Sequence, residues 1–190
     1  MGNYYALWCE TMSSLRLINE TSISSSVSSF SVEDVFSSDF DIYKITCTDL
    51  STTGTDYVDV NMRLITAGGS VVTASNYKYG YRLGLSFLAF ADTKSTSATS
   101  IYRGFSETTD QSPEVGSSVM WVFNPYNSTE HTQVLIQNSQ SYGGSYYTFM
   151  NGGGWLTTNG SIAGFQAVDN HGSRPLASGT FRTYGLRVDK

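Results

Sequence analysis

Short runs in which apolar and polar residues alternate are the feature that most restricts the fold of this 190-residue chain. Residues 58–64 alternate in this way, and residues 119–123, 133–137, 146–149 and 181–188 show the same period of two. Turn-forming residues separate the runs, at Thr53-Gly54, Ala67 to Gly69, Asn124-Pro125, Tyr142 to Gly144, Asn151 to Gly154, Asn159-Gly160 and Asn170 to Gly172. Such spacing is typical of antiparallel sandwiches and barrels. Beyond residue 20 no stretch is long enough for a helix that connects parallel strands. The sequence therefore predicts an all-β, antiparallel β-sandwich that is jelly-roll-like, with about eight strands or more.

One side of each alternating run should face the core. The predicted core contains Tyr43, Ile45, Val58, Val60, Met62, Val119, Trp121, Phe123, Phe149 and Phe181. Two stretches rich in Ser and Thr are less regular. Residues 22–31 fit either a linker or a surface strand, and Val27, Phe30 and Val32 favour the strand. Residues 91–96 have no apolar anchor and are predicted to form an exposed loop.

Residues 1–18 differ from the rest and form a predicted N-terminal arm, with the sandwich domain at 19–190. Leu7, Trp8, Met12 and Leu15 are spaced loosely like one face of a helix. A segment this short does not hold itself together in water, so it must pack on its own domain, on a sister subunit or on another protein. We expect it to be an attachment segment whose anchors are Tyr4, Tyr5, Leu7, Trp8, Leu15, Leu17 and Ile18.

The charge of the chain argues against nucleic acid as a partner. The net charge is −5 and 14% of the residues are charged, whereas nucleic-acid-binding proteins carry a concentrated basic patch. The arginines are scattered and are interpreted as solvated strand positions, namely Arg63, Arg82, Arg103, Arg182 and Arg187. No run approaches the roughly 18 apolar residues of a membrane span, and the first residues do not resemble a signal peptide. We expect synthesis in a cytoplasm and no membrane insertion.

Two cysteines, Cys9 and Cys47, leave a pairing open. Cys47 lies in the predicted strand 43–47, which favours a small buried thiol instead. The chain has no C-x-x-C motif, so zinc binding and thioredoxin-like chemistry are not expected.

Catalytic signatures are weak. The chain has only His131 and His171, and it has no G-x-S-x-G turn that would present a serine nucleophile. Glycoside hydrolysis needs only two facing carboxylates, which the chain has at Asp39, Asp41, Glu107, Asp110, Glu114 and Glu130. Most of these stand in turn-like contexts, where carboxylates usually bond nearby backbone N–H groups. We therefore expect a protein that is not an enzyme and uses no metal or cofactor.

Aromatic residues beside turns are candidates for ligand contact, because their faces suit both protein interfaces and flat sugar faces. If a glycan is bound, the sequence places its site on loops that carry Tyr126, Tyr142 or Trp155. The alternative is ordinary packing or subunit contact. Tyr77, Tyr79 and Tyr81 also alternate, which fits one face of a strand.

Four segments carry a resemblance to a known family: residues 35–45, with Val35-Phe36-Ser37-Ser38-Asp39-Phe40 before a Tyr-containing strand, 60–64, 74–80 and 178–186. They are similar to parts of the β-sandwich modules of tailed-bacteriophage virion proteins, particularly those of marine and cyanobacterial phages. The resemblance extends over about residues 18–190.

The resemblance implies a structural protein of the virion, assembled from a chain made in the host cytoplasm. It further implies contacts with other capsid or tail proteins and a homo-oligomer, of which a trimer is one form. The first expectation is a capsid-decoration or head-fibre subunit attached through its N-terminal arm. The alternative is a tail-associated module that binds a host surface glycan or receptor.

Overall fold

The computed structural model describes residues 14–54, 57–86, 88–109, 114–142 and 146–187, except for the side chain of Tyr142. Twelve β-strands and no helix lie in this part of the chain. The first six strands are β1 (Leu15–Ser22), β2 (Ser29–Val32), β3 (Ile42–Thr52), β4 (Val58–Thr66), β5 (Tyr77–Leu85) and β6 (Leu88–Ala98). The others are β7 (Ile101–Thr108), β8 (Gly116–Phe123), β9 (Gln133–Tyr142), β10 (Tyr146–Leu156), β11 (Ile162–Asp169) and β12 (Leu176–Leu186).

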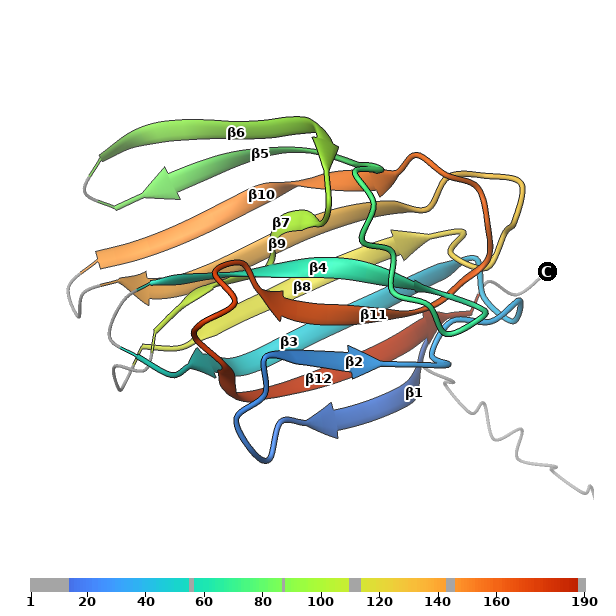
Figure 1. Ribbon diagram of the computed structural model, residues 1–190, viewed down its shortest axis with the longest axis horizontal. Coiled ribbons are helices and arrows are strands. Elements are labelled where there is room, and N and C mark those ends of the chain that lie inside the picture. Colours follow the sequence, from blue (N-terminus) through green and yellow to red (C-terminus); the bar gives the residue numbers. More distant parts are fainter. Residues whose placement is uncertain (1–13, 55–56, 87, 110–113, 143–145, 188–190) are drawn as a thin grey trace, which may run out of the picture.

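The strands form two antiparallel sheets packed as a sandwich, which confirms the predicted fold class. The large sheet has the order β1-β12-β3-β8-β9-β10-β5-β6, and the small sheet has the order β2-β11-β4-β7. In the sequence, β1, β12, β3 and β8 are each next to a strand of the small sheet. This pairing is that of an eight-stranded jelly roll. The hairpins β5–β6 and β9–β10 then extend the large sheet beyond the small one (Figure 1).

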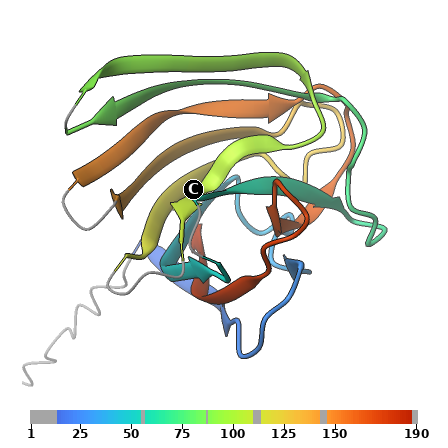
Figure 2. The ribbon, with the colours of Figure 1, turned by 60° about the vertical axis from the view of Figure 1, so that its left-hand side comes forward.

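The core lies between the two sheets and is rich in aromatic rings. The Phe181 ring on β12 contacts three rings from the small sheet, with centroid distances of 5.3 Å to Phe30, 5.2 Å to Phe105 and 6.2 Å to Phe165. Figure 2 shows the small sheet lying along the inner face of the curved large sheet. The opposite face of the large sheet is covered by no element among the described residues, and we call it the open face.

The predicted core is right for β3, β4 and β12 and wrong for β8 and β10. Tyr43, Ile45, Val58, Val60, Met62 and Phe181 are fully buried. In contrast, Val119, Trp121 and Phe123 are half-buried on the open face, and Phe149 is 40% exposed there. The inward positions of these strands hold Met120, Val122 and Met150. Both sides of β8 are apolar, so alternation alone did not identify the buried side.

Three further expectations need correction. The strand β1 begins at Leu15, so the last four residues of the predicted arm, 15–18, belong to the sandwich and pair with β12. Residues 91–96 lie in β6, an edge strand with mostly exposed side chains, and not in a loop. The surface strand at residues 22–31 is present in part, as β2 and a bridge from Val27 to Leu176.

Other residues follow the sequence more closely. Tyr77 and Tyr81 are buried on the inner face of β5, with Tyr79 half-buried beside them. The Tyr77 hydroxyl accepts a hydrogen bond from the Leu64 N–H and donates one to the Val72 carbonyl. Cys47 is fully buried, and burial raises the pKa of its thiol. This confirms the buried thiol, while Cys9 lies outside the described residues.

The corrected parity of β8 gives a test of the fold. Phe181→Ala should lower the free energy of unfolding by about 3–5 kcal/mol, because it empties a fully buried site among three other rings. Trp121→Ala should cost less than about 2 kcal/mol, because the indole lies on the open face and its loss leaves no internal cavity. Chemical denaturation of both variants measures the difference. Equal losses would show that β8 faces the other way.

Candidate functional site

The open face is built from side chains that alternate with the buried ones and therefore form rows across the strands. One row runs through Arg182, Thr46, Val119, Gln137 and Asn151. A parallel row runs through Tyr184, Lys44, Trp121, Leu135 and Gly153. Because β-strands fix each position, the rows form a rigid surface that does not depend on loops.

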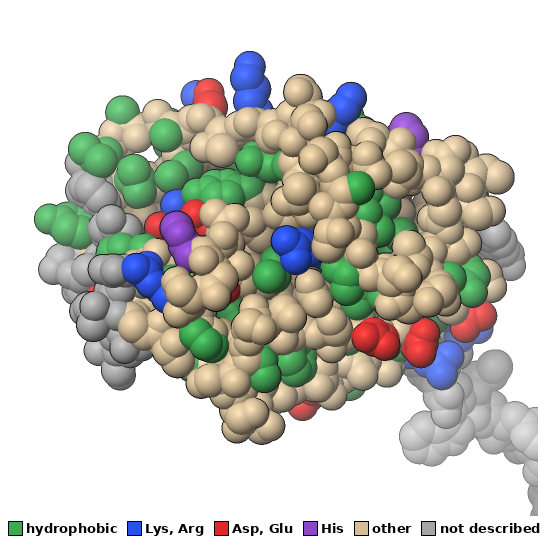
Figure 3. Space-filling model, viewed as in Figure 1, with side chains coloured by type: hydrophobic (Ala, Val, Ile, Leu, Met, Phe, Trp, Pro, Cys, Tyr) green, Lys and Arg blue, Asp and Glu red, His purple; other side chains and the backbone are tan. Residues whose placement is uncertain are grey.

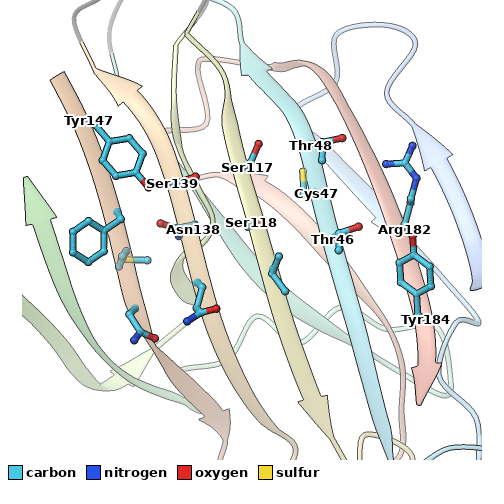
Figure 4. Close-up of a pocket in the computed structure, with 15 residues that line it drawn as sticks. Thr46, Cys47, Thr48, Ser117, Ser118, Asn138, Ser139, Tyr147, Arg182 and Tyr184 are labelled. Carbon is cyan, nitrogen blue, oxygen red and sulfur yellow. The ribbon is translucent and has the colours of Figure 1, made fainter. Parts of the chain in front are cut away.

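A trough of about 750 Å³ crosses this face from β12 to β10. Its floor consists of short polar side chains, chiefly Thr46, Thr48, Ser117 and Ser139, with Val119 among them. Larger side chains stand at its two sides: Tyr147 and Phe149 on β10, and Arg182 and Tyr184 on β12. Figure 4 shows the short side chains of the floor between Tyr147 on one side and Arg182 and Tyr184 on the other. The volume lies within the range of small-molecule and oligomer sites, about 300–1,000 Å³.

The β10 side of the trough is an aromatic ledge. The rings of Tyr147 and Phe149 lie 6.3 Å apart with only 27° between their planes, and they are 50% and 40% exposed. Phe149 leans over Gly84 on β5, where a Cβ atom would overlap the ring. Phe90 on β6 packs edge-on against Phe149, with its centroid 6.1 Å away. The glycine therefore leaves the space that the Phe149 ring occupies beside the exposed Tyr147 ring.

The β12 side of the trough is polar. The Arg182 Nε donates to the Glu20 carboxylate at 2.6 Å, which fixes the guanidinium across the edge of the sheet. Tyr184 lies one row further along the same strand and directly faces Lys44 on β3. The trough thus offers flat rings on one side and hydrogen-bonding groups on its floor and on the other side.

A second hollow of about 400 Å³ lies beside the trough on the same face. Phe123, Leu135 and Trp155 surround it, and Gly153 and Gly154 leave its floor as bare backbone. The Lys78 Nζ lies 5.9 Å from the centre of the Trp155 ring, and the Lys44 Nζ lies 5.7 Å from that of Trp121. These contacts hold both indoles in place.

The three candidate glycan residues are not brought together. Trp155 is 40% exposed on the open face, but it lies within β10 and not in a loop. Tyr126 follows β8 and borders a separate small hollow with Phe40 and Asn124. Tyr142 ends β9 and pairs with Tyr146, nine residues from Trp155 along β10, about 30 Å away at strand spacing. Of the candidate side chains that the structure describes, Trp155 is the one on the open face, where it borders the second hollow.

The predicted anchors are placed only in part. Leu15, Leu17 and Ile18 lie in β1, where Leu17 is 50% exposed and Ile18 is 37% exposed. Tyr4, Tyr5, Leu7 and Trp8 lie outside the described residues. Sequence reasoning missed Tyr147, Phe149 and Tyr184 as site residues, because it assigned Phe149 to the core and did not consider the other two. Their signal was present: they are large aromatic residues on strands whose other parity is also apolar.

The carboxylates considered for glycoside hydrolysis do not gather. Glu107 binds Arg103 at 2.9 Å, and Glu114 is buried against Thr109 at 3.1 Å. Asp39, Asp41 and Glu130 are exposed at positions away from the trough, and Asp110 lies outside the described residues. His131 and His171 are exposed too. No described residue lining the trough is acidic or a histidine, and the described residues contain no cluster of ligands suited to a metal.

A partly buried ion triad joins β4 and β7, two neighbouring strands of the small sheet. The Arg103 Nε donates to Asp59 at 2.6 Å and its Nη1 contacts Glu107 at 2.9 Å, with all three side chains about 15% exposed or less. The sequence analysis interpreted Arg103 as a solvated strand position, and the structure shows that this interpretation is wrong. Its φ of 48° is unusual for a residue other than glycine, and the triad holds the backbone in this conformation.

The triad has two acids for one base. Burial lowers the pKa of Arg103, but attraction to Glu107 and Asp59 outweighs this and raises it overall, so the guanidinium stays charged. Burial raises the pKa of Glu107 by more than Arg103 lowers it, and the nearby Asp59 raises it further. The charged form of Glu107 is therefore less favourable in the folded protein than in the unfolded chain.

No protein-family model, no curated protein and no solved structure matches the chain. Its function must therefore be inferred from the geometry of the open face. No helix in the described residues is long and apolar enough to cross a membrane.

The triad predicts a specific dependence on pH. Because the folded-state pKa of Glu107 is raised, its contribution to stability is fully present below its unfolded pKa of about 4.3 and is lost as pH rises through the folded value. Glu107→Gln should therefore be at least as stable as the wild type at pH 7, and this advantage should disappear near pH 4. Urea denaturation across this range measures it.

Asp59→Asn is the control for the triad. It removes the closer partner of Arg103 and should cost about 3–5 kcal/mol, as is typical when one member of a buried pair is lost. A Glu107→Gln variant that is less stable than the wild type at pH 7 but equal to it at pH 4 would contradict the assignment.

Proposed function

We propose that the protein is a non-catalytic carbohydrate-binding module that holds an extended glycan in the trough of the open face. The observation that carries the proposal is the ledge of Tyr147 and Phe149, two exposed rings with nearly parallel planes beside a floor of hydroxyl groups. Sugar rings have an apolar face and a rim of hydroxyl groups. The aromatic ledge matches the apolar face of a sugar ring, and the floor of the trough matches its hydroxyl groups.

The floor can exchange hydrogen bonds with a sugar in both directions. A Ser or Thr hydroxyl donates one hydrogen bond and accepts others, and the Gln137 and Asn151 amides do both. An aromatic ring contributes apolar area with little loss of side-chain freedom. A mixed lining of this kind favours a neutral or weakly polar surface with many hydroxyl groups over a purely apolar ligand.

The dimensions favour a chain over a single sugar. From β12 to β10 the trough crosses four inter-strand steps, about 19 Å at strand spacing. It is open along its length, and the second hollow with Trp155 continues it on the same face. We therefore propose a ligand with several linked sugar rings.

The virion role expected from the family resemblance stays a proposal. Within it, the trough favours the tail-associated, glycan-binding form over capsid decoration. Capsid decoration requires only adhesion to neighbouring subunits. Adhesion of this kind does not need an open trough with a polar floor. A truncation test of the arm should retain Leu15 onward, because removing residues 1–18 also removes the first half of β1.

Variants of the ledge test the proposal. Tyr147→Ala and Phe149→Ala should each weaken glycan binding about 5- to 30-fold, which corresponds to the loss of one to two kcal/mol. Ser139→Tyr should block the floor without removing a contact, since tyrosine is well accepted in strands. A glycan array identifies the ligand, and titration calorimetry measures the affinities.

Tyr126→Ala is the matched control, because Tyr126 is 39% exposed but lies outside the trough. It should bind as the wild type does. If the three trough variants also bind as the wild type does, or if no glycan on the array is bound, the proposal is wrong. If the trough instead holds a second copy of the chain, the wild type will be a dimer that these variants dissociate.

A further inference from the structure

Basic residues are concentrated on the open face of an otherwise acidic protein. On the described part of this face the basic residues are Lys44, Lys78, Arg82, Lys94 and Arg182, and the acids in register with them are Glu20 and Asp92. The chain as a whole has a net charge of −5. Seen from the small sheet, the surface is mostly neutral, with separate basic and acidic side chains scattered over it (Figure 3). The open face therefore has the opposite sign to the whole molecule.

The three lysines account for the excess. Arg182 pairs with Glu20 at 2.6 Å, and Arg82 pairs with Asp92 at 3.3 Å. In the described residues no ion pair involves Lys44, Lys78 or Lys94. They are also all the lysines in the described part of the chain.

The lysines are neighbours of the two hollows and do not line them. Lys44 faces Tyr184 at the rim of the trough, and Lys78 faces Trp155 at the second hollow. Lys94 faces Gly80, beside the bare backbone of Gly153. A lysine on an edge strand such as β6 also protects the edge from pairing. This does not explain Lys44, which lies on β3, the third strand from its edge.

We infer that the glycan bound in the trough is an acidic polysaccharide, with carboxylate or sulfate groups that contact Lys44 and Lys78. The inference rests on the proposed carbohydrate-binding function and specifies its ligand. Lys44 and Lys78 are held over indole rings 5.7 and 5.9 Å away. Their ammonium groups are therefore positioned before binding, and less freedom is lost when an anion arrives.

The test uses an array of neutral polysaccharides beside their acidic counterparts, including dextran with dextran sulfate and a neutral polymer with its uronic-acid form. The acidic members should bind more tightly, and binding should weaken as salt rises and screens exposed charges. Which acidic form binds better distinguishes sulfate from carboxylate. Lys44→Gln and Lys78→Gln should each weaken binding about two- to fivefold, as expected for exposed charge pairs.

Arg16→Gln is the matched control, because it removes the same charge from the opposite face of β1. It should leave the affinity unchanged. Ser139→Tyr keeps every charge but blocks the trough, so it should abolish binding of the acidic polymer. If the acidic polymer still binds to Ser139→Tyr, or if Arg16→Gln weakens binding as much as Lys44→Gln does, the attraction is non-specific and the inference fails.

If neutral glycans bind most tightly and their binding does not depend on salt, the inference of an acidic ligand is wrong. The proposed carbohydrate-binding function then still holds. If no glycan of either kind is bound, the proposed function itself is wrong. The two failures are therefore distinguishable in one experiment.

Discussion

The contact between Phe181 and the rings of the small sheet is the interaction on which the rest of the structure depends. Phe30, Phe105 and Phe165 come from β2, β7 and β11, and all of them meet one ring on β12. Together with the other buried side chains of the core, this contact holds the small sheet against the large one, since the two sheets share no ladder of hydrogen bonds. These rings pack on only one face of the large sheet, its inner face. The open face of the large sheet is therefore not needed to hold the two sheets together.

Because the open face does not hold the sheets together, its side chains can be suited to contact with a ligand. An antiparallel sheet tolerates water on one side, so the floor of the trough can consist of Ser and Thr without an unsatisfied group in the core. The hairpins β5–β6 and β9–β10 widen the sheet past the jelly-roll strands. The widening supplies β10, which carries the aromatic ledge, and β5, whose Gly84 gives Phe149 the space to lie flat. The site thus depends on the added hairpins as much as on the underlying sandwich.

The sequence predicts the architecture well and the site poorly, for one physical reason. Alternation identifies a strand, and on β3 and β4 only one parity is apolar, so Tyr43 and Met62 could be assigned to the core. On β8 both parities are apolar, and the larger residues, Trp121 among them, face outward. Large hydrophobic side chains were taken as a sign of burial, whereas on β8 they lie on the open face. The prediction of a loop at residues 91–96 failed for the opposite reason. These residues lie in an edge strand whose side chains are mostly exposed on both faces, so the sequence shows no apolar period there.

A site on strands also differs from the loop site that the sequence suggested. Loop aromatics such as Tyr126 must lose freedom when they close on a ligand, and that loss subtracts from affinity. The rings of Tyr147 and Phe149, and the indoles beneath Lys44 and Lys78, are already ordered by their strands and neighbours. Their spacing is fixed by the sheet, so the ligand must match a repeat set by the strands. A polymer with a regular backbone meets that requirement along its whole length, which a compact ligand does not.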